Sequence, residues 1–141
     1  MISNDAFTSW KSFVEAIGLQ FLNGMTDSQI ASQVSGRTVR WEGIIDRVQL
    51  NKDAPGAAID MEACQLQIGL NRTVQLDCLY LPIDSQFISN WERRNPGERI
   101  VFEATLGTGA APFPAIELHH LPSGKSLISV RLFNARLLES S

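Results

Sequence analysis

The sequence predicts a mainly β domain that follows a short helical segment, because the spacing of apolar residues changes at Gly36. Before Gly36, apolar residues recur every three or four positions, which is typical of amphipathic helices. After Gly36, apolar and polar residues alternate, which is typical of strands with one buried face. We therefore expect an N-terminal helical segment over residues 1–35 and a β domain over residues 36–141.

Composition places the chain among soluble globular proteins. Its 141 residues suffice for one domain with a core, and 44% hydrophobic with 19% charged residues excludes a disordered or fibrous chain. Its apolar runs are too short to predict a membrane span, and its first residues lack the pattern of a signal peptide. We expect a cytoplasmic protein with no membrane partner.

Two helices are expected in the N-terminal segment. Asp5 can cap the first, whose apolar face we expect to pack on the β domain or, alternatively, on a partner or a second copy of the chain. Thr26 and Gln29 form a capping box for the second, which Gly36 ends. The residues of the first apolar face are Phe7, Trp10, Phe13, Val14, Ile17 and Phe21.

Five strands are expected after Gly36, or six if residues 115–121 also form one. The five lie near 38–50, 58–70, 73–81, 99–106 and 127–138. A change in the alternation near Gly43 indicates a bulge or bend in the first strand. Asp84 or Ser85 can begin a helix that runs to about Arg94, between the third and fourth strands. Trp41 and Trp91 are expected in the core.

Three segments carry a resemblance to a known fold. Gly36–Gly43, Pro96–Phe102 and Val130–Leu138 are similar to the first, fourth and last strands of small bacterial members of the oligonucleotide/oligosaccharide-binding (OB) superfamily, including anticodon-binding-like ones. The resemblance covers residues 36–138. It implies a five-stranded Greek-key barrel, with a binding surface on the second and third strands and on the loops at 51–56 and 107–114.

The resemblance also implies a non-enzymatic module that binds single-stranded DNA or RNA, through basic residues and stacking aromatics. The expected contributors at strand edges and loops are Arg40, Arg47, Lys52, Arg72 and Phe113. Alternatively, each arginine pairs with a neighbouring acid such as Glu42 or Asp46, and Phe113 anchors its loop.

The alternation of the second and third strands predicts a polar binding face without an aromatic residue. This face comprises Gln65, Gln67, Gln75 and Asp77, together with Leu79, whereas Cys78 and Tyr80 are expected to point inward. Such a face also suits a saccharide or small ligand.

Charge favours the competing function, a protein-interaction or assembly module. The chain has 12 basic and 15 acidic residues. One basic and three acidic residues lie in residues 1–35, so the β domain carries 11 basic and 12 acidic residues and is nearly neutral. Domains that bind nucleic acid by bulk charge are usually strongly basic. Nine of the basic residues are nevertheless arginine, which suits bidentate phosphate contacts.

No pattern of catalytic or metal-binding residues stands out, so we expect no enzyme, metal or cofactor. Cys64 and Cys78 are expected to be packed free thiols rather than a disulfide. Adjacent residues of a strand point to opposite faces, so Glu117 and His119 share a face that His120 does not, and two ligands do not make a metal site.

Overall fold

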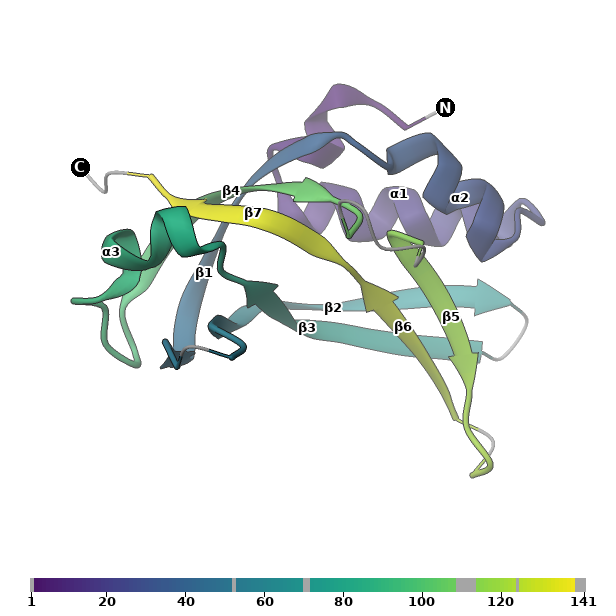
Figure 1. The fold of residues 1–141 in the computed structure, drawn as a ribbon. Coiled ribbons are helices and arrows are strands. Elements are labelled where there is room, and N and C mark those ends of the chain that lie inside the picture. The colour runs from purple at the N-terminus through teal and green to yellow at the C-terminus, as the bar shows by residue number, and fades with distance from the viewer. Residues whose placement is uncertain (1, 52, 70–71, 109–113, 124, 139–141) are drawn as a thin grey trace.

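The computed structural model describes residues 2–51, 53–69, 72–108, 114–123 and 125–138 (Figure 1). The described strands form a five-stranded sheet in the order β3-β2-β1-β4-β7 and a separate two-stranded sheet, β5-β6. The mainly β prediction is therefore confirmed. The strands of the larger sheet are β1 (Thr38–Gln49), β2 (Gly56–Gly69), β3 (Arg72–Pro82), β4 (Arg99–Leu106) and β7 (Leu132–Leu137).

β1 is the central strand, and it pairs antiparallel with both β2 and β4. β3 and β7 are the outer strands of this order, yet Cα atoms of the two approach within 8 Å. No strand ladder joins them within the described chain. The sheet therefore coils back towards itself, but the described strands do not close into a barrel, so the expected Greek-key barrel stays a prediction.

The region expected to be the last strand consists of two strands, β6 (Ser126–Val130) and β7. Arg131 separates them, because its N–H donates to the carbonyl of Ala115 and its carbonyl accepts from the N–H of Gly107, both at 2.8 Å. β6 pairs with β5 (Ile116–His120), which is the sixth strand that the sequence left open. This hairpin projects beside the ends of β2 and β3 (Figure 1).

The helical segment begins with a 3₁₀ helix at Asn4–Phe7 and continues with α1 (Trp10–Leu22). Ser9 caps α1, where its Oγ accepts from the N–H of Ser12 at 3.3 Å. The expected cap, Asp5, instead lies inside the 3₁₀ helix, because the chain turns once before α1 starts. All six residues of the predicted apolar face are buried.

An aromatic cluster joins α1 to the sheet. The ring of Trp41 on β1 lies 4.8 Å from that of Phe13 and 5.2 Å from that of Trp10, between centroids. Trp10 Nε1 also donates to the carbonyl of Glu62 on β2 at 2.9 Å. Trp41 and Trp91 are both buried, as expected. The apolar face of α1 therefore packs on the β domain, which was the first of the alternatives from the sequence.

α2 (Asp27–Val34) has the predicted capping box between Thr26 and Gln29, and Gly36 follows it with a φ of 81°. Asp27 also reaches the hairpin, where its Oδ2 accepts from the N–H of Leu118 at 2.8 Å. α2 thus holds β5 in place against the rest of the molecule.

The bulge in β1 lies at Asp46, not at Gly43. Val39, Trp41 and Ile45 are all buried, and the register with β2 shifts between Ile45 and Arg47. Gly43 is needed for a different reason, because Ile59 and Met61 of β2 leave no room for a Cβ there.

The helix expected between the third and fourth strands is present but short. It consists of a 3₁₀ turn at Ser85–Phe87 and α3 (Ile88–Trp91), so it ends before Arg94. None of the described helices is both long and apolar enough to cross a membrane.

The packing of α1 leads to a stability prediction. Phe13→Ala should lower the free energy of unfolding by about 3–5 kcal/mol, because it removes a fully buried ring. Leu19→Ala is the control on the same helix, where the side chain is 57% exposed, and should change the free energy by less than about 0.5 kcal/mol. Urea unfolding followed by tryptophan fluorescence measures both. Equal effects of the two variants would contradict the packing of α1 on the sheet.

Candidate ligand-binding site

A bulge in β2 reverses the alternation of β3. Asp60 pairs with Cys78 and Cys64 pairs with Leu76, so three residues of β2 lie opposite one residue of β3. Val74 and Leu76 are buried before this point, and Leu79 and Leu81 are buried after it. The expected orientations of Leu79, Cys78 and Tyr80 are therefore wrong: Leu79 points inward, and the other two are exposed.

Tyr80 lies flat on the outer face of the sheet, where 51% of it is exposed. Its phenol ring covers Gly56, because a Cβ on that glycine would overlap the ring. Ala58 pairs with Tyr80 on one side and with Arg47 on the other. Directly opposed residues share a face, so Arg47 and Tyr80 lie on one surface, about 10 Å apart at the backbone.

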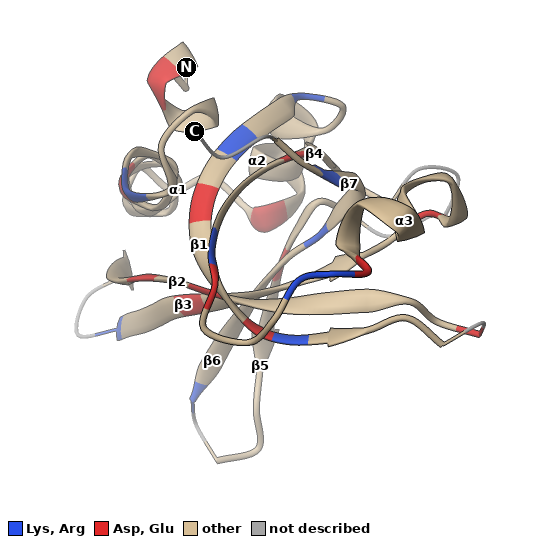
Figure 2. Cartoon of the chain, turned by 90° about the vertical axis from the view of Figure 1, so that its left-hand side faces the viewer, with Lys and Arg blue, Asp and Glu red and all other residues tan. Residues whose placement is uncertain are grey.

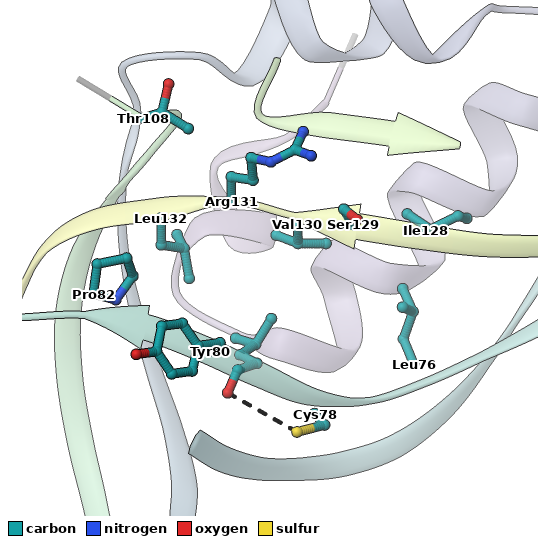
Figure 3. Close-up of a pocket in the computed structure, with 11 residues that line it drawn as sticks. Leu76, Cys78, Tyr80, Pro82, Thr108, Ile128, Ser129, Val130, Arg131 and Leu132 are labelled. Atoms are coloured by element: carbon teal, nitrogen blue, oxygen red, sulfur yellow. Dashed lines mark hydrogen bonds between the residues drawn. The ribbon is translucent and has the colours of Figure 1, made fainter. Parts of the chain in front are cut away.

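A pocket of about 430 Å³ opens beside Tyr80, between β3 and the β6–β7 segment (Figure 3). Side chains of β3 line one wall, and those of β6 and β7 line the other. The walls are mainly apolar, with a few polar groups at Thr108, Ser129 and Arg131. The lining residues are Leu76, Cys78, Leu79, Tyr80, Pro82, Thr108, Ile128, Ser129, Val130, Arg131 and Leu132.

Arg131 is held at the rim of this pocket by partners on the hairpin side. Its Nη1 lies 2.7 Å from Glu117 Oε1 and donates to the carbonyl of Pro114 at 3.1 Å. Glu117 also lies 3.6 Å from His119 Nε2. Among the described residues, no group of three or more His, Cys, Asp or Glu could hold a metal ion.

The two cysteines are free, as expected, but Cys78 is exposed rather than packed. Partial burial raises the pKa of the Cys78 thiol, and the carboxylates of Asp60, Asp77 and Asp46 raise it further. Burial also raises the pKa of Cys64, with a further contribution from Glu62. Both thiols are therefore protonated at neutral pH and are poor nucleophiles.

The predicted nucleic-acid contacts lie at different places on the sheet. Arg40 on β1 is exposed and pairs with Glu103 at 3.4 Å, not with Glu42. Arg47 follows the β1 bulge, and Arg72 begins β3 beside the hairpin. The other two predicted contacts, Lys52 and Phe113, lie outside the described residues.

The four polar residues of the predicted binding face are brought together. Gln65 pairs with Gln75 across β2 and β3, and Gln75 Nε2 donates to Asp77 Oδ2 at 3.1 Å. Gln67 is exposed on the same face of β2. Their contact with a ligand stays a prediction.

Most arginines of the described chain pair with glutamates. β1 carries both basic and acidic residues (Figure 2), so neither sign dominates that strand. Arg72 differs, since its Nη2 contacts Ser126 Oγ at 2.6 Å and His120 Nδ1 at 3.0 Å, and neither is a carboxylate. The pairs are Arg40–Glu103, Arg94–Glu98, Arg99–Glu42, Arg131–Glu117 and Arg136–Glu103.

The ion pairs that Glu103 forms with Arg136 and Arg40 lead to a prediction about the pH dependence of stability. Hydrogen bonds from Arg136, and more weakly from Arg40, lower the pKa of Glu103 against an opposing effect of burial. Since the folded pKa lies below the unfolded one, this stabilisation is complete above about pH 4.5 and is lost as the pH falls through the folded pKa. The stability difference between wild type and Glu103→Gln should therefore shrink below pH 4.5 in thermal unfolding. The control is Glu92→Gln, an exposed carboxylate without an ion pair in the described chain, and an equal pH response in both variants would contradict the interaction.

Comparison with known protein-family models finds no match, and comparison with curated proteins finds none either. The function of this chain is therefore inferred from its own residues and their geometry.

Proposed function

We propose that this chain is a non-enzymatic binding module with an OB-type barrel, and that its ligand is single-stranded nucleic acid. The strand order supports the barrel, since β1 pairs with both β2 and β4, and β3 returns to the vicinity of β7. α3 lies between β3 and β4 in the chain. In this interpretation the β6–β7 segment is the fifth strand of the barrel, and β5 is an addition before it.

The exposed ring of Tyr80 is the observation that carries the ligand assignment. Gly56 supports one face of the ring, and half of the residue remains open to solvent. Stacking of bases on such aromatic side chains is a general means of holding single strands, because every base has a flat π surface. Tyr80 is on β3 and its ring lies over Gly56 of β2. The outer face of the second and third strands is the one that OB folds use for ligands.

The pocket beside Tyr80 suits a nucleobase. Its volume of about 430 Å³ lies within the range of small-ligand sites, and its apolar walls carry few polar groups. A base can stack on the tyrosine, while Ser129 offers a hydroxyl group to its polar edge. Arg47, on the same surface as Tyr80, is placed to meet a backbone phosphate.

Binding of labelled oligonucleotides tests this proposal. Fluorescence anisotropy with single-stranded DNA and RNA at low salt should give a micromolar or tighter dissociation constant, weakening as salt increases. Tyr80→Ala should weaken binding about tenfold to a hundredfold, because stacking contributes roughly 1–3 kcal/mol per base. Tyr80→Phe is the matched control, since it keeps the ring, and should bind within about twofold of wild type.

Two results would contradict the proposal. One is no binding by the wild type even at low salt. The other is binding that Tyr80→Ala leaves unchanged while thermal unfolding confirms that the variant is folded.

The second candidate is a protein-interaction module, which two exposed leucines of α1 favour. Leu19 and Leu22 are 57% and 49% exposed, and they flank a shallow groove of about 200 Å³ against Gln65 and Gln67 of β2. If this surface joins two copies of the chain, light scattering after size exclusion should show a dimer at high concentration. The double variant Leu19→Glu, Leu22→Glu should then be monomeric, and a monomeric wild type would contradict self-association.

A further inference from the structure

A second cleft, of about 430 Å³, lies between the start of β3 and the start of β6. Among the described residues that line it, the charged ones are Arg72 and Lys125, and none is an acid. The remaining lining residues are Ile68, Thr73, Val74, Gln75, Ser126 and Leu127. The cleft therefore has a positive charge that its own walls do not neutralise.

The contacts of Arg72 leave its charge available. A guanidinium carries five donors and no acceptor, so Ser126 Oγ and His120 Nδ1 accept from Nη2. Neither of these partners is an acid, and no carboxylate pairs with Arg72 in the described chain. The Nη1 and Nε donors of Arg72 have no acceptor among the described residues, so they remain for a negatively charged ligand.

A second groove on the molecule also contains two basic residues, but acidic residues line it as well. The groove between the start of α1 and the β1–β2 pair also contains two cations, Lys11 and Arg99. It is lined as well by three acids, Glu42, Asp60 and Glu62, and Arg99 pairs with Glu42 at 2.5 Å. Basic residues alone therefore do not make an anion site here, and the cleft at Arg72 differs by lacking acids.

The cleft and the pocket beside Tyr80 lie along the same two strand segments. Residues 72–75 of β3 and residues 125–127, at the start of β6, line the cleft. Further along the same segments, residues between 76 and 82 and between 128 and 132 line the pocket. Eight residues separate Arg72 from Tyr80, or about 26 Å along a strand. One extended ligand could therefore occupy both.

We infer that the cleft formed by Arg72, Lys125 and Ser126 binds a phosphate group. Arg72 supplies its charge and the N–H donors of Nη1 and Nε, Lys125 a second positive charge, and Ser126 a hydroxyl. This inference rests on the proposed function where the phosphate belongs to the strand whose base stacks on Tyr80. The same chemistry would accept a small phosphate compound, and the experiment distinguishes the two sources.

The test uses the full chain and a length series of labelled oligothymidylates, measured by anisotropy at several salt concentrations. The variants are Arg72→Gln and Lys125→Gln. Arg93→Gln is the matched control. Arg93 is exposed and forms no ion pair with a described residue. It follows α3, which lies at the opposite end of the sheet from the β5–β6 hairpin (Figure 1). Thermal unfolding verifies that each variant is folded. In a parallel titration, calorimetry measures binding of inorganic pyrophosphate.

We expect Arg72→Gln to weaken binding of long oligomers about tenfold and to lower the slope of log K against log salt by about 0.7. It should not affect oligomers too short to extend from Tyr80 to the cleft. Tyr80→Ala should weaken binding at every length, so failure of the proposed function and failure of the cleft give different results. Equal behaviour of Arg72→Gln and Arg93→Gln at all lengths, with no loss of pyrophosphate binding, would overturn the inference.

A different pattern would identify a small phosphate compound as the ligand. Pyrophosphate would bind to wild type and not to Arg72→Gln, while oligomers would not bind at all. That result would support the cleft as a phosphate site and would reject single-stranded nucleic acid as the ligand of the module.

Discussion

The packing of Trp41 is the interaction on which the rest of the structure depends. Its ring is 1% exposed and contacts aromatic rings from α1 and from β4, where Phe102 lies 6.4 Å away between centroids. Its Nε1 donates to the carbonyl of Ala6 at 3.3 Å, which satisfies the polar end of the side chain. Aromatic pairs of this kind contribute about 0.5–1.5 kcal/mol beyond the area they bury. The cluster therefore unites the helical segment and the sheet in one core.

This core also positions the candidate binding surfaces. α1 and α2 are adjacent, and Asp27 at the start of α2 accepts a hydrogen bond from the backbone of β5. The hairpin is fixed in turn beside β3, where Ser126 and His120 meet Arg72. Burial of the N-terminal aromatic residues is thus linked, through α2 and the hairpin, to the walls of both the pocket and the cleft.

The molecule has no extended surface of one charge among its described residues, because most of its arginines are paired with glutamates. Glutamates pair with most of the arginines, so the nearly neutral β domain offers few uncompensated cations. A ligand would consequently be held at particular points, an aromatic ring at Tyr80 and a guanidinium at Arg72, rather than by the field of the whole protein.

The sequence by itself determined the two N-terminal helices, the apolar face of the first, the capping box of the second, and the approximate extent of the first four predicted strands, because these depend on local propensity and periodicity. The last predicted strand proved to be two, β6 and β7. The sites were only partly accessible to it: Arg72 was predicted, whereas the exposure of Tyr80 was not. A bulge shifts strand alternation by one residue and moves every later side chain to the opposite face. In β2 the buried residues are Ile59 and Met61 before the bulge and Leu66 after it, so the alternation changes at Ala63–Cys64, which is a local signal of that shift. Only the tertiary structure decided which face Tyr80 occupies, through the pairing of β2 with β3. Only the tertiary structure brings Arg72 to Ser126, 54 positions away in the chain.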